Sequence, residues 1–343
     1  MELLTKTINS IVRLDDRIKE QMQEKQDSLA KPVGSLGRLE ELSITIAAAQ
    51  QTMTPSCKNK WITIFSADHG IATQGVTNAP QIVTALQTMN FIGEGAGINA
   101  ITKIEGIEIS VTDVGIACDY DPTGIRQCKI KRGTDNMVVG PAMSREQAIK
   151  ALEVGIQTVA EIDELDILGT GEMGLGNTSA STAILATFLD LDVDAITGIG
   201  SGITDEMRIN KSRLISKAIE VNAPDASDPI DVLSKVGGLE IGAIAGAMLA
   251  AAARHVPVIV DGFISSAAAQ IAITLCPEIK DYMILSHQSA EKGHNLISER
   301  MGMRPLFDLG LRLGEGTGAA LAINLCETAV QVVNQMVTLQ SLA

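Results

Sequence analysis

The segment LDILGTGEMGLGNTSASTAILATFL, residues 165–189, predicts a buried strand, a glycine-rich turn and a helix in immediate succession. The helix is expected to open at Thr178, Ser179 or Ser181. A turn of this kind presents several backbone N–H donors at a helix N-terminus, which suits a phosphate or a carboxylate. The glycine spacing matches neither GxxxxGK[ST] nor an early GxGxxG, so it supports neither a nucleotide P-loop nor a dinucleotide fingerprint.

The same succession of strand and helix recurs along the chain. Helical patterns such as 144–162 and 205–222 follow short β-branched runs that end in Gly, Asp or Ser. This alternation predicts an α/β fold with a doubly wound, mainly parallel sheet, in which ligands bind beyond the carboxyl ends of the strands. The predicted strands are WITIFSAD (61–68), IEISVTDVG (107–115), LDILGTG (165–171), AITGIG (195–200), VPVIVDG (256–262) and YMILSH (282–287).

The two ends of the chain differ from its middle. Residues 1–52 and 319–343 are helical in pattern and contain no predicted strand. We expect them to form a small helical domain from both termini, beside a large α/β substrate-binding domain over residues 53–318.

Composition excludes several classes of function. The net charge is −14 and there is no basic block, which argues against a nucleic-acid partner and against capture by anionic membranes. The longest apolar stretch, residues 241–253, is too short to span a bilayer. The N-terminus is charged and amphipathic, unlike a secretion signal. Five scattered cysteines without CxxC and four unclustered histidines predict no disulfide framework and no metal site. A cytoplasmic location fits best.

Polar residues gather where the predicted strands end. Lys211 lies two turns into the helix after the 198–204 turn, within reach of a phosphate, although a surface lysine is the ordinary alternative. Ser289 and Ala290 offer backbone donors in a further turn, and Asp261 ends a strand. Glu172 is either a ligand for sugar hydroxyls or a solvated loop carboxylate.

The first predicted strand ends in Asp68 and His69. This pair suggests acid–base work, but no serine or cysteine nucleophile stands in an elbow nearby, and we expect His69 to have a structural role. Pro80 is expected to start the next helix, which places Gln87 two turns along it. Gln87 is suited to contact a planar heterocycle.

Glu315 lies between glycines in LRLGEGTGAALAINL, residues 311–325. Gly314, Gly316 and Gly318 allow a close backbone approach to a ligand. Because a helix is predicted from Ala319 onward, Glu315 is either a helix-capping acid or a functional carboxylate.

Eight segments in this order resemble the nicotinate-nucleotide:5,6-dimethylbenzimidazole phosphoribosyltransferases, enzymes that activate the lower ligand of cobalamin. The resemblance covers nearly the whole chain. The segments are KPVGSLGRLE (31–40), ADHGIATQGV (67–76), VGPAMSREQA (139–148), GEMGLGNT (171–178), IDVLSKVGG (230–238), VDGF (260–263), SHQSAEKG (286–293) and RLGEGTGAAL (312–321).

The resemblance implies a Rossmann-like domain with a six-stranded sheet, a dimer (homo- or heteromeric) and no cofactor. The substrates would be nicotinate mononucleotide and an aromatic base, with Glu315 as catalytic base and Glu172 near the reacting region. Gln87 matches a residue of the benzimidazole pocket, whereas Ala79 stands where relatives often have Ser. Further substrate-binding positions, most of them matched to the mononucleotide site, are Met173, Gly174, Asn177, Gly202, Lys211, Asp261, Ser289 and Ala290.

Other functions stay open at this point. Ala79 leaves room for a paralogue that uses phenolic or other acceptors, with or without a partner subunit. A non-catalytic module that binds ribazole-like nucleotides is a third alternative. A nicotinamide-dependent dehydrogenase is disfavoured, because its fingerprint is missing.

Overall fold

The computed structural model describes residues 1–200 and 202–342. Its centre is a six-stranded sheet in the order β3-β2-β1-β4-β5-β6, and every neighbouring pair is parallel. This confirms the predicted α/β class and the parallel sheet. The strands are β1 (Lys60–Ala67), β2 (Glu108–Gly115), β3 (Arg126–Gln127), β4 (Ile167–Met173), β5 (Val258–Val260) and β6 (Met283–Leu285).

One predicted strand is wrong. Residues 195–200 continue from a short helix, α8 (Val193–Ile196), into a loop. The Asp192 carboxylate accepts a hydrogen bond from the Ala195 amide at 2.8 Å and so caps a helical turn. A short apolar run does not distinguish a strand from a buried helix. The sixth strand is instead β3, whose two residues are too few to show the alternation of apolar and polar residues that marks a strand.

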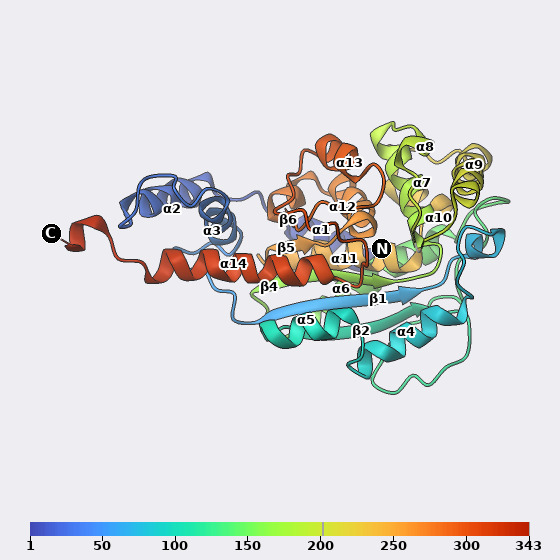
Figure 1. The fold of residues 1–343 in the computed structure, drawn as a ribbon, viewed down its shortest axis with the longest axis horizontal. Coiled ribbons are helices and arrows are strands. Elements are labelled where there is room, and N and C mark those ends of the chain that lie inside the picture. The colour runs from blue at the N-terminus through green and yellow to red at the C-terminus, as the bar shows by residue number, and fades with distance from the viewer. Residues whose placement is uncertain (201, 343) are drawn as a thin grey trace.

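Helices cover both faces of the sheet (Figure 1). One apolar cluster joins the sheet to α6, α7 and α10–α12, and another joins its opposite face to α3, α4, α5 and α14. None of the helices in the described ranges is long and apolar enough to cross a membrane. The helices are α1 (Glu2–Ser10), α2 (Asp16–Ser28), α3 (Arg38–Ala49), α4 (Ile82–Ile92), α5 (Gly97–Glu105), α6 (Arg145–Ala160), α7 (Asn177–Leu189), α8, α9 (Asp205–Asn222), α10 (Pro229–Val236), α11 (Leu239–Ala253), α12 (Phe263–Leu275), α13 (His294–Met301) and α14 (Thr317–Gln335), with short 3₁₀ turns η1 (Gly70–Gln74), η2 (Pro277–Tyr282) and η3 (Leu339–Leu342).

The terminal helices pack in two places. Met22, Ala47 and Val333 form a small separate core between α2, α3 and the end of α14, which extends away from the sheet in Figure 1. Helix α1 packs instead on α6 and α11, beside the sheet.

The strand order locates the place where a ligand is expected. From β1 the chain proceeds through β2 to β3 on one side, and from β4 through β5 to β6 on the other. The topological switch point therefore lies between β1 and β4, and open α/β sheets bind ligands beyond the carboxyl ends of the strands at this point.

Candidate active site

A cavity of about 350 Å³ lies beyond the carboxyl ends of β4 and β5. Its wall is built from strand-end turns and from one side of α4. It contains most of the residues that the sequence predicted: Ala79, Gln87, Glu172, Met173, Gly174, Asn177, Asp261, Ser289 and Glu315. Gly202, Lys211 and Ala290 are outside its lining.

Glu315 adopts a left-handed backbone conformation, with φ of 63° between Gly314 at 79° and Gly316 at 93°. Its carboxylate turns away from α14. Oε1 accepts a hydrogen bond from Gln87 Nε2 at 2.7 Å, and Oε2 accepts one from the backbone N–H of Ile98 at 3.2 Å. Ile98 lies in the first turn of α5, so Glu315 caps α5 and not the helix that follows it in sequence.

Burial raises the pKa of Glu315, and the hydrogen bonds from Ile98 and Gln87 oppose the shift. The residue is only 5% exposed, yet it lines the cavity. A carboxylate with a raised pKa and two fixed donors is a better base than an ordinary glutamate, and its position is held.

Asp261 takes the capping role that the sequence offered to Glu315. Its Oδ1 accepts a hydrogen bond from the Ala319 amide at 2.9 Å at the start of α14. Burial raises the pKa of Asp261 to about 7, although the amides of Ala319, Gly318 and Gly316 act in the opposite direction. Asp261 thereby ties the turn that carries Glu315 to the end of β5.

Glu172 is buried and is not a solvated loop acid, since only 6% of it is exposed. Its carboxylate accepts hydrogen bonds from the Asn177 side-chain amide and from the Glu315 backbone N–H. Burial, followed by the neighbouring Asp261 and Glu240 carboxylates, raises the pKa of Glu172 to about 8. Gly314 has a left-handed backbone that favours glycine, and a Cβ atom there would also displace the Glu172 carboxylate.

Gln87 lies in the cavity as expected, but both ends of its amide have protein partners. Nε2 donates to Glu315, and Oε1 accepts a hydrogen bond from Asn90 at 3.3 Å. These bonds fix the orientation of the amide. Gln87 thus holds Glu315 in addition to bordering the space that a ring would occupy.

Lys211 is buried, with 1% exposed, which excludes the surface-lysine alternative. Its Nζ donates to Thr178 Oγ1 at 2.7 Å, and Thr178 lines the cavity in the first turn of α7. Burial lowers the pKa of Lys211 to about 8, while the Glu291 carboxylate opposes that shift. An ammonium beside a helix N-terminus is a strong site for an anion.

The loop amides predicted as anion donors are engaged elsewhere. The Ser289 N–H donates to His294 Nδ1 at 2.9 Å, and the Ala290 N–H donates to the Leu311 carbonyl at 2.9 Å. These two residues therefore offer no free backbone donor, because the loop folds back on α13 and on the 308–313 segment. Gly202 is exposed, and its carbonyl accepts a hydrogen bond from Asn78.

Several lining residues were not singled out from the sequence. His287 stacks on Phe307 with ring centroids 5.9 Å apart, and burial lowers its pKa to about 4, so it is neutral. Arg312 and Leu313 also line the cavity, directly before Gly314. Their place beside the Glu315 turn is the signal that could have identified them. Arg312 donates to the Gly200 carbonyl at 3.3 Å.

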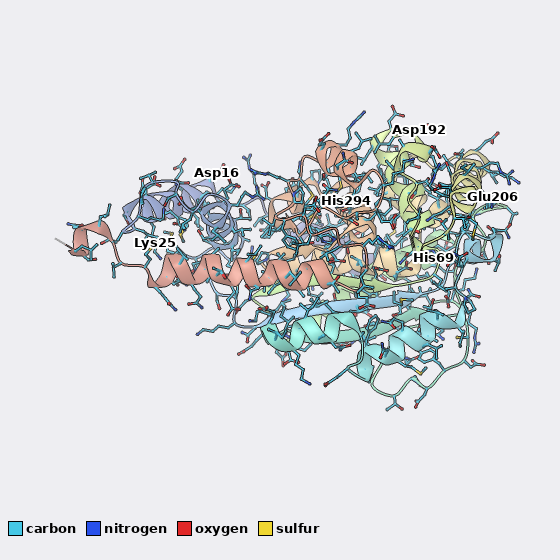
Figure 2. The ribbon with its side chains drawn as sticks, viewed as in Figure 1. Asp16, Lys25, His69, Asp192, Glu206 and His294 are labelled. Carbon is cyan, nitrogen blue, oxygen red and sulfur yellow. The ribbon has the colours of Figure 1, made fainter. Side chains whose placement is uncertain are left out.

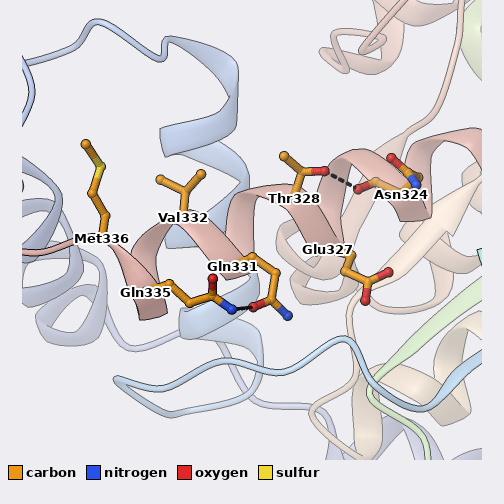
Figure 3. A pocket seen from close by; sticks show the side chains of 7 residues that line it. All are labelled: Asn324, Glu327, Thr328, Gln331, Val332, Gln335 and Met336. Atoms are coloured by element: carbon orange, nitrogen blue, oxygen red, sulfur yellow. Dashed lines mark hydrogen bonds between the residues drawn. The ribbon is translucent and has the colours of Figure 1, made fainter.

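A second hollow, of about 510 Å³, lies along α14 (Figure 3). Its side chains are Asn324, Glu327, Thr328, Gln331, Val332, Gln335 and Met336. All seven come from one helix and the residue that follows it, and none is a predicted site residue. Within residues 1–200 and 202–342 no group of three or more His, Cys, Asp or Glu side chains is arranged to hold a metal ion.

Comparison with known proteins is consistent with this geometry over the full chain. A family model described as phosphoribosyltransferase matches residues 11–342. The nicotinate-nucleotide--dimethylbenzimidazole phosphoribosyltransferase of Alkaliphilus metalliredigens is 48% identical over 343 residues, covering 99% of this chain and 98% of the relative. The enzyme of that name from Geobacter metallireducens is 47% identical over 341 residues, covering 98% and 97%.

A solved structure agrees in fold. The crystal structure of the Thermus thermophilus nicotinate-nucleotide–dimethylbenzimidazole phosphoribosyltransferase superposes with a TM-score of 0.90 at 35% identity, over 95% of this chain and 98% of that one. The sheet, the ordered sequence segments and these matches lead to one conclusion: the chain belongs to the nicotinate-nucleotide–dimethylbenzimidazole phosphoribosyltransferase family.

Proposed function

We propose that this protein transfers phosphoribosyl from nicotinate mononucleotide to 5,6-dimethylbenzimidazole or a related aromatic base. The products are the α-ribazole phosphate and nicotinate, in assembly of the cobamide nucleotide loop. The relatives named above match this chain over its whole length, and they are named for this activity. The observation that carries the proposal is the Glu315 carboxylate, held in the cavity by Gln87 and Ile98.

The charges around the cavity suit the donor nucleotide. Lys211 and the first turn of α7 offer an anion site for the phosphate. The carboxyl groups of Glu172, Asp261 and Glu315 lie along the cavity, where the Glu315 carboxylate faces a cationic pyridinium and the positive charge that develops on the ribose. Glu172, whose pKa is raised to about 8, is mostly uncharged at neutral pH and contributes hydrogen bonding there. The ribose lies between these regions, bordered by Gly174, Asn177 and Met173. The Ser289 side chain lines the same cavity.

The transfer needs one displacement and one proton acceptor. The acceptor ring nitrogen attacks the anomeric carbon, the bond to the pyridinium nitrogen breaks, and its electron pair neutralises the departing nicotinate ring. Configuration inverts at the anomeric carbon. The Glu315 carboxylate receives the proton from the acceptor's other nitrogen, while the cavity orients the two rings on either side of the ribose.

The activity should show a pH optimum whose acid and alkaline limbs arise from two different residues. Its acid limb follows Glu315, whose raised pKa means that the base form is lost as the pH falls through that value. Its alkaline limb follows Lys211: above about pH 8 the free protein loses the ammonium that binds phosphate. We expect kcat/KM for the nucleotide to fall roughly tenfold per pH unit there, while kcat stays level because bound phosphate keeps Lys211 charged. Parallel alkaline limbs of kcat and kcat/KM would contradict this assignment.

Ala79 determines how the acceptor is held. It lines the cavity in the segment before α4, and its methyl group offers no hydrogen bond. Replacing Ala79 with Ser adds a hydroxyl for the acceptor's second nitrogen, and one hydrogen bond contributes about 0.5–1.5 kcal/mol. We expect Ala79→Ser to lower the KM for 5,6-dimethylbenzimidazole by roughly twofold to tenfold and to leave a phenolic acceptor unchanged. A panel of benzimidazoles, purines and phenols with product identification tests this; an equal gain for phenols would contradict it.

The proposal extends to organisation. We propose that both termini (1–52 and 319–343) contribute to a small helical domain, through α2, α3 and the end of α14 and without α1, and that the protein works as a dimer in the cytoplasm. The separate Met22–Ala47–Val333 core supports the first point. The five cysteines, all of them free thiols, support the location.

A binding module without catalysis predicts a different result from the same mixture. It would bind the nucleotide and release no nicotinate. A mass-resolved assay of the purified protein with nicotinate mononucleotide and mixed acceptors distinguishes the two functions.

A further inference from the structure

The end of β1 leads into a buried hydrogen-bonded pair of side chains that does not line the cavity. His69 Nε2 lies 2.6 Å from Glu240 Oε1, and the two side chains are 1% and 0% exposed. Glu240 lies in the first turn of α11, 171 positions away in sequence. Figure 2 labels His69 close to the carboxyl end of β1. Glu240 Oε2 is buried and has no hydrogen-bond partner among the described residues.

The glycine-rich turn after β4 rests on this pair. A Cβ atom on Gly174 would lie 3.2 Å from Glu240 Oε1 and 3.4 Å from His69 Nε2. One on Gly176 would lie 3.2 Å from His69 Cβ. Both glycines line the cavity, and Gly176 is the N-cap residue of α7. His69 and Glu240 therefore form part of the surface against which the turn packs, together with the Ala67 carbonyl, which is the nearest atom to such a Cβ on Gly174.

This turn carries the groups proposed to hold the nucleotide. Glu172 and Asn177 stand at its two ends and are hydrogen-bonded to each other. Thr178, the next residue, accepts the hydrogen bond from Lys211. A shift of the turn would move all of these groups with respect to the anion site.

The acceptor side has an anchor of its own in the neighbouring residue, Asp68, although one hydrogen bond also links it to the turn. Thr84 Oγ1 donates to Asp68 Oδ1 at 2.7 Å, which fixes α4 one turn before Gln87. The Leu175 amide also donates to Thr84 Oγ1, at 3.3 Å. Asp68 thus orients the helix that carries Gln87, whereas His69 faces the turn on the nucleotide side.

We propose that His69 and Glu240 are positioning residues, whose hydrogen bond sets the place of the 174–176 turn and so the geometry of the nucleotide site. The inference rests on the proposed phosphoribosyl transfer. It assigns a function to His69 beyond packing: neither residue touches substrate, and both act through the turn. Replacing a whole buried pair with apolar residues of similar volume is often neutral for stability, so geometry can be tested apart from folding.

The test compares His69→Leu/Glu240→Met with conservative variants. We expect the double variant to keep its melting temperature within a few degrees, to raise the nucleotide KM at least tenfold and to leave the acceptor KM within threefold. Glu240→Gln keeps an acceptor oxygen, and His69→Gln keeps a donor at the Nε2 position, so both should stay within threefold of the parent. His69→Asn is too short to reach Glu240 and should resemble the double variant.

A control removes a buried pair elsewhere: Gln26→Leu/Ser43→Ala deletes the 2.7 Å bond between α2 and α3 and should leave the nucleotide KM unchanged. An unchanged nucleotide KM in the double variant would overturn the proposal. If the double variant does not fold, equal nucleotide KM values for His69→Gln and His69→Asn would overturn it. If the parent releases no nicotinate, the proposed function itself fails, and calorimetric Kd values for nicotinate mononucleotide then test positioning in the same variants.

Discussion

Replacing Glu315 with Gln is expected to lower kcat by roughly 10²–10⁴-fold, the usual contribution of a general base. The amide has the size of the carboxylate but cannot accept the proton from the acceptor ring. Binding of nicotinate mononucleotide should persist, because the phosphate site at Lys211 and Thr178 is untouched. Single-turnover nicotinate release together with a calorimetric Kd measures the two effects separately.

The fold should survive the substitution. The introduced glutamine side chain can present its oxygen to the Ile98 amide while its NH2 group faces Gln87. The amides of Gln87 and Asn90 must then both rotate, so that each NH2 group again meets an oxygen. The matched control is Glu299→Gln, an exposed acid on α13, which should retain full activity. Near-parental kcat in Glu315→Gln would remove Glu315 from the role of base and leave it as the cap of α5.

Replacing Lys211 with Ala is expected to raise the nucleotide KM by roughly 10–100-fold, with a smaller change in kcat. A hydrogen bond to a charged group contributes about 1.5–3 kcal/mol, and the loss falls on the phosphate, which does not change during the reaction. The variant relieves the cost of burying an amine, which offsets part of the cost of the cavity that the side chain leaves.

The control for this variant is Lys217→Ala, an exposed lysine on the same helix. It tests whether a general loss of positive charge from a chain of net charge −14 is enough to weaken nucleotide binding. An unchanged nucleotide KM in Lys211→Ala, or an equal rise in Lys217→Ala, would place the phosphate elsewhere.

Local patterns in the sequence predicted much of the fold. The runs at 61–68, 107–115 and 165–171 match β1, β2 and β4 to within two residues. Parallel strands that are buried on both faces have nearly continuous apolar sequences, which makes them easy to recognise. Thr204 caps α9 by accepting a hydrogen bond from the Met207 amide. The strand predicted at 195–200 is wrong because Asp192 caps a helical turn there. Strand β3 was not predicted because two residues are too few to show the alternation of apolar and polar residues that marks a strand.

The site was predicted less completely, since its contacts join distant segments. Gln87 and Ile98 are 228 and 217 positions from Glu315, so nothing near Glu315 in sequence shows that it caps α5. Asp261 caps α14 across 58 positions in the same way. The Ser289 and Ala290 amides fit an anion-binding pattern, but their partners, His294 and Leu311, depend on how the loop folds. Local sequence thus indicated which residues gather at the strand ends, and tertiary packing decided which of their polar groups stay free.

The cavity around Glu315 is proposed to transfer phosphoribosyl to an aromatic base. The most direct measurement incubates the purified protein with nicotinate mononucleotide and 5,6-dimethylbenzimidazole and follows both products by mass and by anomeric configuration. We expect equimolar nicotinate and α-configured riboside monophosphate, formed by the parent and by Glu299→Gln and nearly absent in Glu315→Gln. Nucleotide binding without nicotinate release by the parent would contradict it.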